Sequence, residues 1–229
     1  MIINHTYKFI FLKTRKTAGT SLEIALSQFC TATDTITPIR WQDERIRRQL
    51  DYVEPRNYRA PVSDYTPSDW LALFYRGPKR LLSNHDPAKH VQRVVGSEIW
   101  QTYFTFCFER NPFDKAISRY YWNTNEPRPP IDEYLQSVQP DLLSNWGIYT
   151  IADQIAVDFV GRYERLNEDL AIIQEKLGLP RPLNLPRAKA GYRKNRDHYS
   201  RVLNAAARQR IEAVCANEIA QFGYHWEAI

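Results

Sequence analysis

The chain has 229 residues, of which 43% are hydrophobic and 25% charged, and its formal net charge is +5. This composition is typical of a globular protein and excludes a disordered chain, a coiled coil or a fibrous repeat. No run of about 18 apolar residues occurs, and the start lacks the form of a signal peptide, so we expect a soluble, cytoplasmic protein without a membrane span. Three widely spaced cysteines fit a reducing compartment better than a disulfide framework or a zinc site.

The excess of basic residues leaves two classes of partner open, nucleic acid and a small anionic ligand. The basic residues are scattered, with local groups at 13–16, 45–48 and 187–201, and they form no run of five like charges. Charge alone therefore does not choose between the two classes, and the positions of the cations along the fold must decide.

The first predicted unit is a strand, a turn and a helix. Residues 8–12 (KFIFL) form a short aromatic-rich run that predicts a buried strand. A polar turn at 13–21 follows, and the apolar residues of 22–29 then lie on one broad helical face. Next, 31–79 includes a helix-like stretch at 41–50 and a region rich in proline, aspartate and tyrosine. We interpret 31–79 as an excursion on the substrate side, or a lid.

The rest of the chain continues to alternate between strands and helices. Further strands are expected at 80–83, 103–108 and 156–163. A helix is predicted to begin at Pro112, and another to run from an N-cap at Asn167 to a stop at Gly178. A long helical pattern fills 199–222. This order predicts one domain over residues 1–229, a P-loop-like three-layer α/β/α fold with a central parallel sheet.

The turn at 13–21 has the residue types of an anion site. Ligands of parallel sheets bind beyond the carboxyl ends of the strands, and a helix N-terminus directs backbone N–H groups and a positive dipole end at one spot. Small and hydroxylated residues admit an anion there, and Arg15 and Lys16 add charge. The Walker A spacing is absent. The alternative is a capped helix start with solvated cations. The candidate ligands of a phosphate or sulfate are Arg15, Lys16, Thr17, Ala18, Gly19, Thr20 and Ser21.

A second candidate pair follows the strand at 103–108. Arg110 leaves the end of that strand, and Ser118 comes eight residues later on the next helix, just over two turns away. Arginine would provide a bidentate fork and serine a hydroxyl for the same phosphate. In the alternative reading, Arg110 pairs with Glu109 or Asp114, and Ser118 bonds local carbonyls.

These two segments together resemble sulfotransferases that use 3′-phosphoadenosine 5′-phosphosulfate (PAPS), closest to the carbohydrate, family 2-like, bacterial-type branch. Residues 15–21 (RKTAGTS) resemble the family's PKTAGTS loop, and 104–120 resemble its F-x-F-V-R-N-P-x-x-R-x-x-S-x-Y segment. Weaker similarities occur at 160–170 and 219–224. The chain departs from the pattern at Arg15, where proline is usual, and at Lys115, where arginine is common.

The resemblance implies roles for these residues. The loop from Lys16 to Ser21 would hold the 5′-phosphosulfate, with Lys16 stabilising the leaving phosphate. Arg110 and Ser118 would hold the 3′-phosphate. A late basic loop with Arg193 and Lys194 is similar in placement to the loop that closes over this cofactor, although a solvated loop is the alternative. The implied cofactor is PAPS, the product 3′-phosphoadenosine 5′-phosphate (PAP), and no metal is required.

Transfer to a hydroxyl also needs a base. A histidine suits this role because its ordinary pKa is about 6.5. His85 follows the predicted strand at 80–83, and several family members place a catalytic histidine in a comparable S-x-H segment. His90 is a weaker rival, in the helix expected next, and a turn or cap role for His85 is the alternative.

The sequence therefore predicts a metal-independent sulfotransferase, with Lys16 and His85 as its catalytic residues. The acceptor is a hydroxyl-bearing small molecule or carbohydrate, and no nucleic-acid partner is expected. Tyr121, Trp122 and the aromatic residues at 58–75 are candidates for stacking on the acceptor, or for core packing. Two alternatives stay open: a non-catalytic PAPS- or anion-binding protein, and a P-loop-like kinase, which would need Mg²⁺. Neither the acceptor nor the oligomeric state follows from the sequence.

Overall fold

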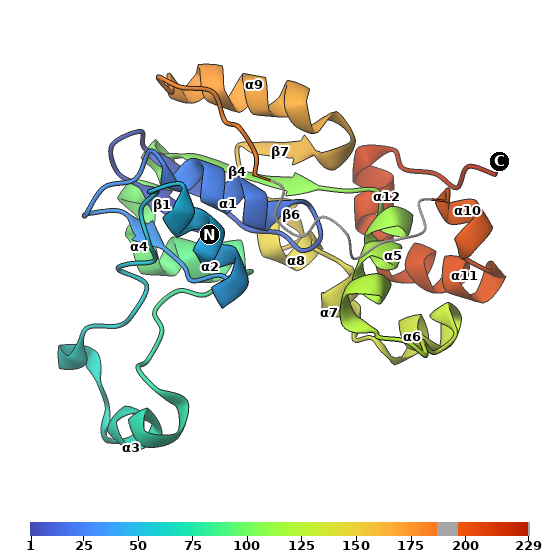
Figure 1. Ribbon diagram of the computed structural model, residues 1–229, viewed down its shortest axis with the longest axis horizontal. Coiled ribbons are helices and arrows are strands. Elements are labelled where there is room, and N and C mark those ends of the chain that lie inside the picture. The colour runs from blue at the N-terminus through green and yellow to red at the C-terminus, as the bar shows by residue number, and fades with distance from the viewer. Residues whose placement is uncertain (187–196, 229) are drawn as a thin grey trace.

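The computed structural model describes residues 1–186 and 197–228, and its centre is a mixed sheet (Figure 1). In the described chain, five strands pair in the order β3-β1-β2-β4-β7. Strands β2, β4 and β7 are parallel, whereas β1 is antiparallel to both of its neighbours. Four strands thus run in one direction and β1 against them. The strands are β1 Ile2–Asn4, β2 Phe9–Phe11, β3 Thr35–Ile36, β4 Phe104–Glu109 and β7 Phe159–Arg162.

Helices precede and follow these strands. None of the helices in the described part of the chain is both long and apolar enough to cross a membrane. A separate two-stranded ribbon pairs β5 (Thr150–Ile151) with β6 (Gln154–Ile155). The helices are α1 Gly19–Ser27, α2 Trp41–Gln49, α3 Pro67–Arg76, α4 Ala88–Thr102, α5 Pro112–Asn123, α6 Ile131–Ser137, α7 Pro140–Leu143, α8 Trp146–Tyr149, α9 Leu166–Leu177, α10 Tyr199–Val202, α11 Ala205–Val214 and α12 Ala216–Phe222.

The expected mixture of helices with a largely parallel sheet is confirmed. Successive residues of the strands point to opposite faces, and both faces are buried. Phe9 and Phe11 pack with Leu22 of α1 and Ile173 of α9 in one hydrophobic cluster. Ile10 packs in a second cluster, with residues of α4 and α8. Likeness to P-loop proteins stays a prediction.

Three expectations about individual elements are wrong. Residues 80–83 form no strand, because Arg80 makes only an isolated bridge with Arg59. The pattern at 199–222 is three helices, and Asn204 separates the first two by capping α11 through a bond from the Ala207 N–H (2.9 Å). Helix α9 has Arg165 rather than Asn167 at its N-cap, although it ends at Gly178 as expected.

Two strand-to-helix turns determine where the site lies. Parallel strands β2 and β4 are neighbours, so their carboxyl ends meet at one edge of the sheet. The turn after β2 leads into α1, and the turn after β4 leads into α5. Helix α5 begins as expected, with Pro112 at its first turn and the Asn111 side chain accepting from the Phe113 N–H.

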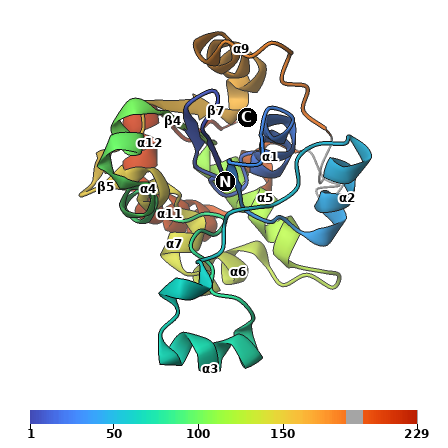
Figure 2. The same ribbon diagram turned by 90° about the vertical axis from the view of Figure 1, so that its left-hand side faces the viewer.

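The excursion expected at 31–79 divides into two parts. Its first part belongs to the body, because β3 pairs with β1 and Arg47 of α2 is fully buried. Residues 57–81 form an arm that stands off from the body and carries α3 at its tip (Figures 1 and 2). The arm has two legs, the chain that leads to α3 and the chain that returns from it. A hydrogen bond from the Ala60 N–H to the Lys79 carbonyl (3.0 Å) joins them.

Strand β7 can approach β4 closely only with a glycine at position 161. A Cβ on Gly161 would lie 2.5 Å from the buried Phe108 ring, whereas a Cβ on Gly147 of α8 would meet nothing within 4 Å. We expect Gly161→Ala to lower the free energy of unfolding by about 1–3 kcal/mol, the usual cost of overpacking a core. Gly147→Ala is the matched control and should change it by less than about 0.5 kcal/mol. Denaturant titration measures both, and equal effects would contradict this packing.

Candidate functional site

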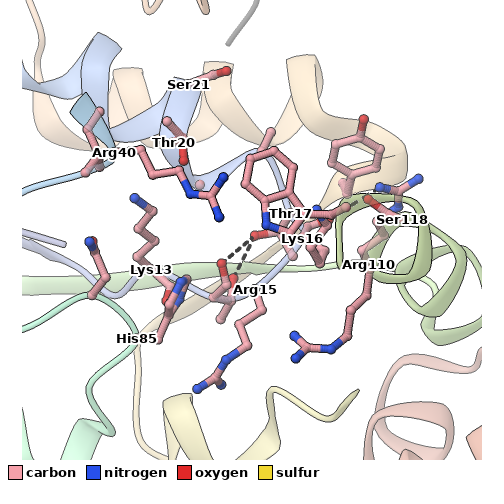
Figure 3. Close-up of a pocket in the computed structure, with 18 of the residues that line it drawn as sticks. Lys13, Arg15, Lys16, Thr17, Thr20, Ser21, Arg40, His85, Arg110 and Ser118 are labelled. Carbon is pink, nitrogen blue, oxygen red and sulfur yellow. Dashed lines mark hydrogen bonds between the residues drawn. The ribbon is translucent and has the colours of Figure 1, made fainter. Parts of the chain in front are cut away.

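A cavity of about 810 Å³ lies where the turns after β2 and β4 meet. It is lined by the 13–21 turn, His85, Arg110 and Ser118, so every candidate site residue that the structure describes reaches one space. In Figure 3, His85 lies at one end of the group and Ser118 at the other, with the turn between them. Arg193 and Lys194 lie outside the described residues. From 31–79, the region interpreted as an excursion on the substrate side or a lid, the described lining residues are Ile39 and Arg40, and none comes from the later part at 50–79.

The cavity is strongly positive. No aspartate or glutamate is among its described lining residues, and the described chain has no group of three or more His, Cys, Asp or Glu side chains placed to hold a metal ion. Its cationic lining residues are Lys13, Arg15, Lys16, Arg40, Arg110 and Arg119. Such a set attracts a ligand with several negative charges.

The turn has an unusual backbone. Lys16 and Ala18 have left-handed φ angles of 62° and 60°, which non-glycine residues rarely adopt. Ala18 is the N-cap of α1 and provides no side-chain cap for the first turn of the helix. Helix geometry leaves the first N–H groups without an intrahelical acceptor. Together with the left-handed residues, they form the kind of concave backbone that binds anions.

Buried hydrogen bonds hold this turn in place. The Thr14 hydroxyl donates to the Phe108 carbonyl of β4 and lies 2.8 Å from the Thr17 hydroxyl. The Asn145 side chain bonds both backbone groups of Arg15, since its Oδ1 accepts from the Arg15 N–H (2.9 Å) and its Nδ2 donates to the Arg15 carbonyl (3.1 Å). The turn is therefore fixed from both sides.

Asn145 is in turn part of a buried charged network. Its Nδ2 also donates to Glu109 Oε1 (3.1 Å), and its backbone N–H donates to Glu218 Oε1 (2.9 Å). Lys115 Nζ lies 2.9 Å from Glu109 and 3.5 Å from Glu218, and all three side chains are buried. The carboxylates outweigh desolvation and raise the pKa of Lys115. Lys115 thus supports the site from the core and does not line the cavity.

One cation of the cavity is already neutralised. Lys13 Nζ lies 2.7 Å from Glu23 Oε2, and both side chains are buried. Burial alone would raise the pKa of Glu23, but neighbouring cations, Lys13 first among them, lower it to about 2. Glu23 is therefore ionised, and this carboxylate of α1 offsets the charge that Lys13 brings to the cavity.

Arg110 is held by the turn, an aromatic ring and one carboxylate. Its Nη1 donates to the Lys16 carbonyl (3.4 Å), its guanidinium lies 4.2 Å from the Tyr163 ring centroid, and its Nη2 is 3.9 Å from Asp114. The predicted alternative of an ion pair is wrong for Glu109, which bonds only the Arg110 backbone N–H, but it holds for Asp114. The guanidinium is thus oriented toward the turn.

His85 borders the opposite side of the cavity. Its Nδ1 lies 2.6 Å from the Lys13 carbonyl, which can only accept, so Nδ1 carries the proton and Nε2 is the lone-pair nitrogen of the neutral ring. Burial, followed by the charge of Lys13, lowers the pKa of His85 to about 3. At neutral pH His85 is therefore an uncharged imidazole that can accept a proton at Nε2.

Sequence reasoning missed several residues of the site. Trp122, predicted either to stack on an acceptor or to pack in the core, contacts two cations of the cavity: its ring centroid lies 4.6 Å from Lys16 Nζ and 4.3 Å from the Arg40 guanidinium. Its position four residues after Ser118 places both on one face of α5, which was a usable signal. Arg40 and Asn145 lie far from the turn in the sequence, so no local pattern pointed to them.

Comparisons with known proteins add one relative. No protein-family model and no solved structure matches the chain. The chain is 34% identical over 110 residues to a protein of Archaeoglobus fulgidus described as an uncharacterized protein, a match that covers 43% of this chain and 88% of the relative. The match thus covers most of the archaeal protein, and the two proteins belong to one family. The description of the relative gives no activity.

The pKa of His85 makes stability depend on pH. Between about pH 6.5 and 3, the unfolded chain binds a proton at His85 that the native protein does not, so stability falls as the pH is lowered through this window. Between pH 7 and 5 this one group should cost about 2 kcal/mol. His85→Asn, which tolerates the left-handed φ of 65°, should reduce that loss. Denaturant titrations without ligand at both pH values measure it, and an unchanged loss in the variant would contradict the pKa.

Proposed function

We propose that the chain is a sulfotransferase that moves the sulfuryl group of PAPS to an acceptor hydroxyl. One observation carries the proposal: the 13–21 turn, His85, Arg110 and Ser118 all line a single cavity. Its volume, about 810 Å³, lies within the range of roughly 300–1,000 Å³ usual for small-molecule sites. Besides Lys13, which Glu23 neutralises, five cations line the cavity without a lining carboxylate among the described residues, and they fit a cofactor with two phosphate groups and a sulfate.

The two motifs suit the two charged ends of this cofactor. The backbone N–H groups of the turn, with the hydroxyl of Thr20, would hold the 5′-phosphosulfate at the N-terminus of α1. Arg110 and Ser118 would hold the 3′-phosphate. Arg110 Nε is buried and has no hydrogen-bond partner within the described chain, which leaves this guanidinium with donor capacity for an anion.

The chain's own residues account for the proton and the charge. When bound, PAPS supplies an activated sulfuryl group whose S–O bond to the 5′-phosphate breaks as a new S–O bond to the acceptor oxygen forms. Nε2 of His85 takes the proton of the acceptor hydroxyl, because Nδ1 is committed to the Lys13 carbonyl. Lys16 neutralises the charge that develops on the phosphate oxygen, as cations do in phosphoryl transfer.

A bound anion would also raise the pKa of His85, which makes it a better base. A histidine with a pKa of about 3 is unprotonated but weakly basic. After burial, the largest causes of the low value include the charges of Lys13 and Arg15. A polyanion in the cavity opposes these charges and raises the pKa of His85 toward the working pH.

A non-catalytic PAPS- or anion-binding protein is the second candidate, and the low pKa of His85 is the observation that favours it. Such a protein needs the cationic cavity but no base. It would bind PAP as tightly as an enzyme does, and substitution of His85 would change nothing except local packing.

Calorimetry with PAP in the presence of EDTA tests the cofactor assignment. We expect PAP to bind, and Arg110→Ala to weaken it at least roughly tenfold, because charge-assisted hydrogen bonds contribute about 1.5–3 kcal/mol. AMP, which lacks the 3′-phosphate, should lose a similar factor with the wild-type protein. Arg48→Ala, a solvent-exposed arginine paired with Glu54, is the matched control and should bind PAP normally.

Two results of this titration would contradict the proposal. One is the absence of PAP binding to the wild-type protein. The other is binding that requires Mg²⁺ and prefers ATP, which would favour a kinase.

His85→Asn separates the enzyme from the binding protein. The variant should bind PAP within about twofold of the wild type but release PAP from PAPS at least roughly a hundredfold more slowly, in line with the usual contribution of a general base. The assay follows PAP release with a panel of hydroxyl-bearing sugars and small metabolites. Release at the wild-type rate would contradict the assignment of His85 as the base. If the wild-type protein binds PAP tightly but shows no acceptor-dependent release, the second candidate is supported.

A further inference from the structure

The arm at 57–81 carries a feature that the proposed function does not use. Figures 1 and 2 both show α3 at its tip, well separated from the sheet and the other helices. The tip exposes large apolar side chains: Trp70 is 48% exposed, Leu71 65%, and Phe74 and Tyr75 83% each. Val62, in the short turn before α3, is 66% exposed.

These side chains form one face. Trp70 and Phe74 are four residues apart on α3, as are Leu71 and Tyr75, so each pair adjoins on the helix surface. A contiguous apolar patch of this kind is uncommon on a protein surface that faces only water, and it marks a site of association. Scattered single residues such as Ile172 of α9, 50% exposed, carry no such meaning.

The tip is preformed. Thr66 and Asp69 make a reciprocal capping box at the start of α3, with Pro67 in the first turn, and the helix ends at Gly77. Lys79 Nζ lies 2.8 Å from Asp69, which ties the second leg of the arm to the helix. The helix therefore presents its apolar face without needing a partner to fold it.

The arm is also basic. Between residues 57 and 81 there are four cations and two carboxylates, and one of these carboxylates, Asp69, is already paired with Lys79. The cations are Arg59, Arg76, Lys79 and Arg80. Segments that insert in the interface of an anionic bilayer have this composition, with aromatic side chains at the tip and cations behind them.

We propose that this arm docks the protein on an anionic lipid surface, with the face of Trp70, Leu71, Phe74 and Tyr75 inserted among the headgroups and upper acyl chains. Arg59, Arg76 and Arg80 contact the lipid phosphates. The second leg of the arm runs directly into Asn84 and His85, so docking holds the cavity beside the bilayer. A second copy of the chain is the less suitable occupant, because a twofold contact between two arms brings like charges together.

Vesicle sedimentation tests the proposal. The probes are phosphatidylcholine vesicles with and without about 30% phosphatidylserine, a composition chosen for the pull of anionic lipid on basic segments. We expect the wild-type protein to bind the anionic vesicles. Leu71→Asp with Phe74→Asp should weaken binding at least roughly tenfold through lost apolar burial, and Arg76→Glu with Arg80→Glu should do so through lost attraction to anionic lipid.

The controls distinguish a lost surface from a lost fold. Ile172→Asp changes an exposed apolar residue outside the arm and should bind as the wild type does. All variants should keep the wild-type thermal unfolding, since the changed side chains are exposed. The absence of vesicle binding, or binding that the arm variants do not change, would overturn the proposal. It would also be overturned if light scattering found a wild-type dimer that the Leu71→Asp and Phe74→Asp variant dissolves while no vesicles are bound.

Discussion

The site depends on one buried amide. Asn145 is fully buried, bonds both backbone groups of Arg15 and reaches the carboxylate of Glu109 at the end of β4. In this way it joins the two turns that form the cavity and holds a stretch of backbone that includes left-handed residues at Lys16 and Ala18. Such conformations persist only where the surroundings determine them, and here the determining group lies in the core.

The same network sets the electrostatics of the cavity. Glu23, Glu109 and Glu218 lie in the interior and bond Lys13 or Lys115 there, while five cations besides Lys13 line the cavity. Charge is thus balanced on the interior side of the turn, whereas the side that faces the cavity stays positive. Burial first, and then the charge of Lys13, lower the pKa of His85 and keep it neutral, and the positive lining prepares the cavity for a polyanion before one is bound.

Local patterns predicted much of this arrangement. The apolar runs located β2 and β4, and the small residues after β2 and Pro112 after β4 located the turns, because those signals depend on a few neighbouring residues. Wrong expectations arose where distant contacts decide. Residues 80–83 are apolar enough for a strand but continue the chain that leaves the arm, and breaks at Asn204 and Cys215 divide a continuous helical pattern. Arg40 reaches the cavity, and Asn145 reaches the backbone of the turn, only through tertiary structure, which one sequence does not contain.

A crystal structure of the protein with PAP tests the central claim most directly. We expect the 5′-phosphate to lie against the backbone N–H groups of the turn that ends at Ser21, with the 3′-phosphate within hydrogen-bonding distance of Arg110 and Ser118. We also expect Nε2 of His85 to face the position from which the sulfuryl group departs. A nucleotide bound elsewhere, or one whose 3′-phosphate lies in solvent away from Arg110, would contradict the proposed cofactor site.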